Sequence, residues 1–242
     1  MTDTIHPNEP QTAEDAATAY RQVQRRLTEV LRAHIADGDK TVPACPAWTV
    51  RQTLAHLCGA AEDVAALNLD GVASDPWTAA QVARHEADSV EQLLVLWEVA
   101  AGEVEALLPH AQAIAANQLV FDAVTHEHDI RGAIGEPGAI SGDLPLVVAL
   151  GFMTTSLDAL IRSRSLPSLR LETDDGTWQL GDPDTAPSQL TLRVTPFDAV
   201  RMIGGRRSFG QLRAADWGGD PEPLFAMFDT SPVRPSNVDL DT

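Results

Sequence analysis

The first half of the chain repeats apolar residues at the spacing of an α-helix. The pattern is clearest in residues 11–36, which we expect to form one long amphipathic helix. The hydroxyl of Thr49 is placed to cap the next helix, and Gly135 stands where the last one should end. Three further helices are expected, at 49–69, within 77–107 and at about 111–134. Four helices with short or moderate connections predict an up-and-down bundle, with a loop at 37–48 between the first two.

The pattern changes after Gly142. One more helix is expected at 144–163, followed by short runs that are typical of strands. These runs lie at 169–173, 177–181 and 189–195. The turn sequence at 174–176 separates the first two runs and predicts a hairpin. Helical segments are expected at 197–205 and near 225–228, and the last dozen residues should form a loose tail.

These elements predict two domains of different class. Residues 1–142 would form the helical bundle, and residues 143–242 a small α+β domain with short antiparallel strands. The chain of 242 residues is 44% hydrophobic and has five tryptophans, which suits folded domains with real cores. The expected fold class is therefore α plus α+β.

Charge and composition limit the partners and the compartment. The formal net charge is −18, from 17 basic and 35 acidic residues, which works against binding to nucleic acid or to an anionic membrane. The sequence shows neither an apolar run long enough for a membrane span nor a signal-peptide core, so we expect a cytoplasmic protein. We expect it to be a monomer or a homodimer. Cys45 and Cys58 should remain reduced there as ordinary small residues.

The fourth predicted helix carries side chains that could bind a metal ion. Asp122 and His126 are four residues apart and Asp129 follows three later, so all three share one helix face. Carboxylate and neutral imidazole suit zinc and similar divalent ions, and His56 of the second helix could supply another ligand inside the bundle. Simpler explanations exist, because an i,i+4 Asp–His pair is often a surface ion pair and a lone His56 is often a core histidine.

Two longer segments favour the metal interpretation. They are CPAWTVRQTLAH at 45–56 and DAVTHEHDIRGAIG at 122–135. Together with LRLETDDGTWQLG at 169–181 and VTPFDAVRMIGGRR at 194–207, they resemble the mycothiol-dependent maleylpyruvate isomerase family. That family belongs to the wider DinB-like group of four-helix metal proteins, and the resemblance covers nearly the whole chain.

The resemblance implies one divalent metal ion, zinc or alternatively nickel, held by His56, Asp122 and His126. The isomerase is expected to have glutamate where this chain has Asp122, which is shorter by one methylene and could change the metal affinity. His128 is rotated about 200° from His126 on the helix and should lie outside the ligand set. Asp129 could orient a ligand from behind or contact the first helix.

The implied activity depends on a thiol cosubstrate. In the family this thiol is mycothiol, the sugar–cysteine thiol of actinobacteria, and a divalent ion would favour its deprotonation. The protein would then be an S-transferase, or a cis–trans isomerase of the maleylpyruvate type, acting on a small electrophile.

Arginines in the second domain could clamp a carboxylate of the substrate or of the thiol. Arg201 is the candidate catalytic residue among them, and Arg206 and Arg207 follow it. The alternative for the last two is an exposed turn with solvated charges. A rival hypothesis for the whole protein is a non-catalytic small-molecule or lipid-binding protein whose C-terminal domain resembles sterol-carrier folds.

Overall fold

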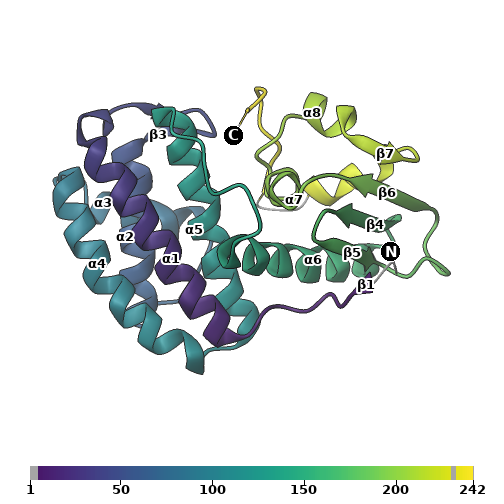
Figure 1. Cartoon of the computed structure of the whole chain (residues 1–242), viewed down its shortest axis with the longest axis horizontal. Coiled ribbons are helices and arrows are strands. Elements are labelled where there is room, and N and C mark those ends of the chain that lie inside the picture. The colour runs from purple at the N-terminus through teal and green to yellow at the C-terminus, as the bar shows by residue number, and fades with distance from the viewer. Residues whose placement is uncertain (1–4, 230–232, 242) are drawn as a thin grey trace. The chain divides into compact units, whose positions relative to one another are not determined.

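The computed structural model describes residues 5–229 and 233–241, and within it the chain divides into two compact units (Figure 1). The helical unit comprises Thr12–Ala139, with Asp241. The mixed unit combines the described residues up to Gln11 with those of Ile140–Leu240. The units therefore separate near residue 140, and the first residues join the C-terminal part of the chain. The predicted domains 1–142 and 143–242 stay a prediction.

Five α-helices build the helical unit. They are α1 (Ala13–Ala33), α2 (Val50–Ala65), α3 (Asp75–Arg84), α4 (Val90–Leu107) and α5 (Ala113–Ile134), with 3₁₀ turns η1 (Ile35–Asp37) and η2 (Leu108–His110). The prediction of a single helix within 77–107 was wrong, because the chain breaks between α3 and α4. Ser89 starts α4 with a capping box, in which its hydroxyl accepts from the Gln92 amide and the Gln92 side chain accepts from the Ser89 amide.

The bundle consists of α1, α2, α4 and α5, and α3 packs on α2. Around the bundle, the closest neighbours are α1 with α4, α4 with α2, α2 with α5, and α5 with α1. Trp97 of α4 is fully buried and donates to the Tyr20 hydroxyl of α1 at 3.0 Å. The fully buried carboxylate of Glu127 in α5 accepts from Arg26 of α1 at 2.6 Å. The contact between α2 and α5 brings together the two helices that carry the predicted metal ligands.

A short hairpin lies in the segment predicted as a loop at 37–48. Strand β2 (Thr41–Val42) pairs antiparallel with β3 (Cys45–Thr49). Strand β3 ends at Thr49, which also begins α2: its hydroxyl accepts from the Gln52 amide, and its own amide donates to the Gln52 side chain. The predicted cap is therefore confirmed, and it fixes where Trp48 meets the helix.

The mixed unit is a five-stranded sheet with helices. Its strands are ordered β1 (Ile5–His6), β5 (Gly176–Leu180), β4 (Ser168–Thr173), β6 (Gln189–Arg193) and β7 (Asp216–Gly218). The predicted hairpin is confirmed as β4–β5, whereas β1–β5 and β4–β6 are parallel pairs. The helices are α6 (Leu144–Arg164), α7 (Pro196–Ile203), α8 (Phe209–Ala214) and the 3₁₀ helix η3 (Glu222–Phe228). The fold class, a helical bundle followed by a small α+β part, is confirmed.

Two features of the mixed unit change the sequence picture. Helix α6 is long and apolar enough to cross a membrane by length and composition, but 56% of its most apolar stretch is buried, as in the core helix of a soluble protein. The predicted loose tail was wrong for the described residues near the C-terminus. Leu240 is buried there, and its carbonyl accepts from the Gln211 side chain at 2.8 Å.

Candidate metal centre

The facing helices α2 and α5 bring His56, Asp122 and His126 together. His56 Nε2 lies 3.3 Å from Asp122 Oδ2, and His126 Nε2 lies 3.7 Å from Asp122 Oδ1. Ligand atoms of the three residues all lie within 4.8 Å of one another. Both imidazoles are buried, whereas the Asp122 side chain is 36% exposed. The predicted residues thus form one compact donor set with an accessible carboxylate.

Hydrogen bonding behind His56 determines which of its ring nitrogens faces this set. His56 Nδ1 lies 2.8 Å from Gln81 Oε1, and Gln81 Nε2 donates to Asp63 Oδ2 at 2.8 Å. The Asp63 carboxylate accepts only, so the Gln81 amide nitrogen must face Asp63 and its oxygen must face His56. His56 therefore carries a hydrogen on Nδ1, and in the neutral form of the ring the lone pair would be on Nε2, toward Asp122.

His126 has the matching arrangement on α5. Its Nδ1 lies 3.1 Å from Oδ2 of the fully buried Asp129, while its Nε2 faces Asp122. Burial is the largest influence on His126 and lowers its pKa, against the opposing effects of Asp129 and Asp122. The ring is thus kept neutral, as a metal ligand must be. Asp129 lies behind His126, as expected for a residue that orients it, and Glu127 contacts Arg26 of the first helix.

The donor set fits a divalent ion of the zinc type. Two neutral imidazole nitrogens and a carboxylate are ligands that zinc prefers, and at bonds of about 2.0–2.1 Å tetrahedral donors lie roughly 3.3 Å apart. The observed separations from Asp122, 3.3 and 3.7 Å, are close to this value. Three protein ligands would leave coordination positions open, as in catalytic zinc sites.

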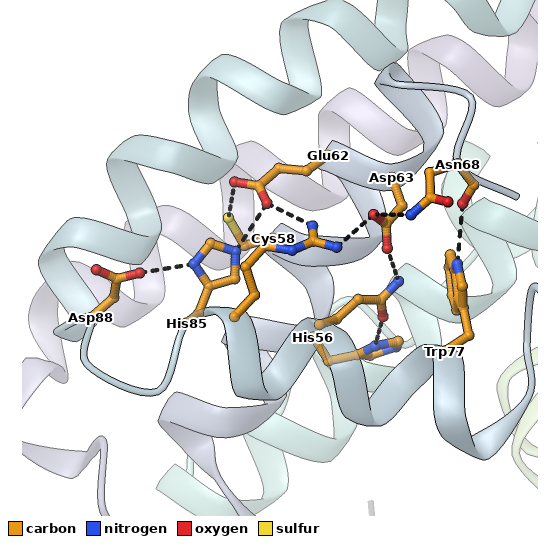
Figure 2. A network of polar contacts seen from close by, with 10 residues as sticks. His56, Cys58, Glu62, Asp63, Asn68, Trp77, His85 and Asp88 are labelled. Atoms are coloured by element: carbon orange, nitrogen blue, oxygen red, sulfur yellow. Dashed lines mark hydrogen bonds and ion pairs between the residues drawn. The ribbon is translucent and has the colours of Figure 1, made fainter.

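A chain of polar contacts holds Gln81 between His56 and Asp63, and the labelled Asp63 and Asn68 of this chain can be followed in Figure 2. Asp63, which bonds Gln81, also accepts from Asn68 at 3.0 Å and from Arg84 at 2.7 Å. Burial alone would raise the pKa of Asp63, but the hydrogen bonds from Gln81, Asn68 and Arg84 outweigh it and lower that pKa. The carboxylate therefore stays ionised and keeps the Gln81 amide oriented toward His56.

Gly59 allows α3 to approach α2 closely enough for this contact. A Cβ at Gly59 would lie 2.6 Å from the Gln81 Cβ, a distance that real Cβ atoms do not reach. The glycine is three residues after His56, so the small residue and the ligand lie on neighbouring faces of the same helix turn. Gln81 was not predicted as part of the site, and the sequence signal that points to it is Gly59, a glycine within a predicted helix.

Trp48 forms one wall beside the two imidazoles. Its ring centroid lies 5.4 Å from that of His56 and 6.0 Å from that of His126, and the two imidazoles meet edge to face at 4.9 Å. Cys45, three residues before Trp48, donates to Asp129 Oδ2 at 3.6 Å. The β2–β3 hairpin thus supports both the rings and the residue behind His126.

The donor set also lines a cavity of about 460 Å³ in the helical unit. Its other walls come from the second half of α2, the segment after α2, helix α3, the end of α4 and the first half of α5. Most of these side chains are apolar, and the buried residues His56 and His126 contrast with exposed ones such as Leu67. The partly exposed Asp122 is one of the residues that line this cavity.

A second cluster of possible ligands, Cys58, Glu62 and His85, has a different character. Both His85 ring nitrogens contact carboxylates, Nε2 to Glu62 at 3.0 Å and Nδ1 to Asp88 at 2.8 Å (Figure 2). Burial raises the pKa of the Cys58 thiol to about 12. These contacts connect α2 with the α3–α4 connection, and they leave Cys58 a neutral, buried thiol.

The predicted arginines lie in the mixed unit. Arg201 of α7 is only 2% exposed, and its role as a catalytic residue stays a prediction. The alternative of a solvated turn was wrong for Arg207, which is buried and bonds Asp198 at 2.9 Å. His128, expected outside the ligand set, is not in the group formed by His56, Asp122 and His126.

Most of the chain has the fold of a known enzyme. A crystal structure of the mycothiol-dependent maleylpyruvate isomerase matches it with a TM-score of 0.56 and 17% identity, over 88% of this chain and 96% of that chain. A histidine-to-alanine mutant of that isomerase matches with a TM-score of 0.53 and 15% identity, over 81% and 90%. The sequence matches no protein-family model and no curated protein. The resemblance inferred from the sequence is thus confirmed at the level of the fold.

Proposed function

We propose that the protein is a metal-dependent enzyme that activates a small thiol of the mycothiol type for addition to an electrophile. The observation that carries the proposal is the His56–Asp122–His126 set at a cavity, within the fold of a mycothiol-dependent isomerase. Zinc is the expected ion and nickel the alternative. A divalent ion bound there would lower the pKa of a thiol that reaches it, so that the thiol reacts as thiolate near neutral pH.

The residues of the chain would bind and orient the reacting groups. Gln81 and Asp129 lie against the Nδ1 atoms of His56 and His126, so both rings turn Nε2 toward Asp122. Trp48 covers one side of the two rings, and the apolar cavity walls keep water from the electrophile. Water exclusion strengthens electrostatic interactions and suppresses hydrolysis of the electrophile.

Two reactions share the same first step. The thiol sulfur forms a bond to an electron-poor alkene carbon, the π pair moves onto the conjugated carbonyl, and the thiol proton balances the new negative charge. In an isomerase, the adduct rotates about the former double bond and the sulfur leaves again. In an S-transferase, the proton ends on carbon and the sulfur stays.

Metal content tests the proposed site. We expect about one zinc or nickel ion per chain in untagged protein and its loss in His126→Ala, because two protein ligands hold such ions poorly. His110→Ala is the matched control, since His110 also lines the cavity but is exposed and outside the donor set. Full metal stoichiometry in His126→Ala, or none in the wild type after reconstitution, would refute the proposed site.

The alternative is a non-catalytic small-molecule or lipid-binding protein, and its lipid-binding form has less support. An apolar pocket among Leu157, Leu192 and Phe225 in the mixed unit measures about 20 Å³, room for little more than one water molecule. A lipid would need a far larger space there. The carrier hypothesis would gain if purified protein contained an apolar ligand and no metal. Arg201 stays a prediction, since an anion would have to enter the core to reach a side chain that is 2% exposed.

A further inference from the structure

The cavity beside the proposed metal ligands has mostly apolar walls. Ala60, Val64, Trp77 and Leu119 line it together with other apolar side chains, and its polar wall residues besides the donor set are Thr78, His110 and Gln118. Its volume of about 460 Å³ equals the liquid share of about 15 water molecules at roughly 30 Å³ each. This is the size and character of a small-molecule site.

Charge in the cavity disfavours an anionic ligand. Among the described residues that line it there is no lysine or arginine, while Asp122 contributes a carboxylate. A ligand carboxylate placed away from His56, Asp122 and His126 would therefore meet neither a lysine nor an arginine on these walls, and His110 is the one other titratable side chain there. Burying an ion without a partner is unfavourable, whereas an uncharged apolar group gains free energy when it is removed from water.

The segment after α2 keeps apolar side chains exposed at the edge of the cavity. Leu67, Leu69 and Val72 are 71%, 44% and 50% exposed, and all three line the cavity. A cluster of exposed large apolar residues at a cavity is typical of a binding site for an apolar ligand.

The backbone of this segment is strained at two of its lining residues. Leu67 and Ala73 have φ angles of 57° and 63°, in the left-handed region that favours glycine. Leu67 follows the C-cap of α2, and the Asn68 amide bonds the Asp63 carbonyl at 2.8 Å, a helix ending in which glycine is usual at this position. Leucine there costs stability and adds an exposed apolar side chain, which suggests selection for ligand contact rather than for folding.

We propose that this cavity binds the uncharged, apolar body of the electrophile, so that the substrate is a neutral hydrophobic molecule rather than a small carboxylic acid. The inference rests on the proposed function for its reaction, but the binding site can be tested without it. It favours S-transfer to a neutral electrophile over isomerisation of an enoic acid, since the acid would bring a carboxylate.

Two related fluorescent probes test the charge preference directly. N-phenyl-1-naphthylamine is neutral, and 8-anilinonaphthalene-1-sulfonate has the same ring system with a sulfonate added. We expect the full-length protein, with or without metal, to bind the neutral probe at least tenfold more tightly. Equal or tighter binding of the sulfonate would overturn the proposal.

Substitutions at Ala115 locate the binding. This residue lines the cavity, is exposed, and lies seven positions before Asp122 on α5, so that changes there leave the donor set intact. Ala115→Trp should fill the cavity and weaken binding of the neutral probe at least tenfold. Ala115→Arg adds a positive charge and should reverse the preference, so that the sulfonate probe binds more tightly. Ala106→Arg is the control, because Ala106 is exposed on α4 and does not line the cavity. An unchanged affinity for the neutral probe in both Ala115 variants would refute the location.

Leu67→Gly separates ligand binding from folding. Glycine relieves the backbone strain of the left-handed conformation at position 67, so the midpoint of urea unfolding should rise. Loss of the apolar side chain should weaken binding of the neutral probe several-fold. A variant that is more stable and binds the probe as the wild type does would contradict the role given to Leu67. Metal content measured on the same samples keeps the two proposals apart: probe binding without metal would refute only the proposed enzyme, and metal without probe binding only the apolar site.

Discussion

Gln81 is expected to control metal affinity although it cannot reach the metal. The change Gln81→Met keeps the length and burial of the side chain but removes the oxygen that accepts from His56 Nδ1 at 2.8 Å. In the metal-free protein the imidazole can respond by shifting its hydrogen or its ring. With an ion bound, Nε2 is committed as ligand, so the hydrogen must stay on Nδ1 and remain buried without its acceptor.

The size of the effect follows from this difference between the two states. A buried donor left without a partner costs about 1–3 kcal/mol, and the cost falls mainly on the metal-bound state. We therefore expect zinc affinity to fall about 5- to 150-fold, which agrees with the range of about 10- to 100-fold for residues behind metal ligands. Competition with a chromophoric zinc chelator measures this change directly.

Gln24→Met is the matched control for general destabilisation. Gln24 of α1 is also a fully buried glutamine, and its amide donates to Thr28 and Glu98 rather than to the site. It should lose stability comparably while zinc affinity stays within about twofold of the wild type. Gln81→Glu should retain zinc affinity, because it keeps an oxygen acceptor, yet lose stability through repulsion from Asp63. Wild-type zinc affinity in Gln81→Met would refute the reasoning.

Three further predictions concern stability and reactivity. Gly102→Ala should stabilise the protein by about 0.5–1 kcal/mol in urea unfolding, since Gly102 lies inside α4 with open space around it, and a loss of stability would contradict this. Cys58 should resist iodoacetamide at pH 8 in the native protein, because it is buried and its pKa is raised to about 12; peptide mass spectrometry showing labelling as fast as in urea would refute this. Because folding lowers the pKa of Asp63, its carboxylate stabilises the folded protein at pH values above its ordinary pKa of about 3.9. This stabilisation is lost as the pH falls through the folded pKa. Asp63→Asn should therefore flatten the acid side of the stability curve measured by urea midpoints. An equally steep acid side in that variant would contradict the assignment.

The sequence predicted best the parts of the fold that depend on local patterns. Thr49 and Gln52 form a capping box within four residues, and Gly135 takes the left-handed conformation, φ 78°, that ends α5. The break between α3 and α4 was missed because apolar residues continue on both sides of it. The β1 strand was missed because two residues carry no periodic pattern, and its partner lies far away in the sequence.

The candidate site likewise combines residues that the sequence predicted with residues that only the packing reveals. Asp122 and His126 share a helix face by their spacing, and the family resemblance indicated His56 as their partner. Gln81 and Asp63 could not be found in this way, because their importance comes only from the packing of α3 on α2. The cavity likewise depends on five separate segments and on which apolar residues the fold leaves exposed.

Strand β1 has a consequence for the order in which the protein is made. Ile5 and His6 leave the ribosome before the helical unit, but their partners Thr177 and Trp178 emerge only after it. The bundle can thus fold while the sheet that β1 will join does not yet exist, since domains generally fold as units during synthesis. A fragment that starts at Ile140 would lack β1 and leave β5 as an open edge, prone to pair with other chains. Attaching residues 5–11 through a flexible linker should restore its solubility.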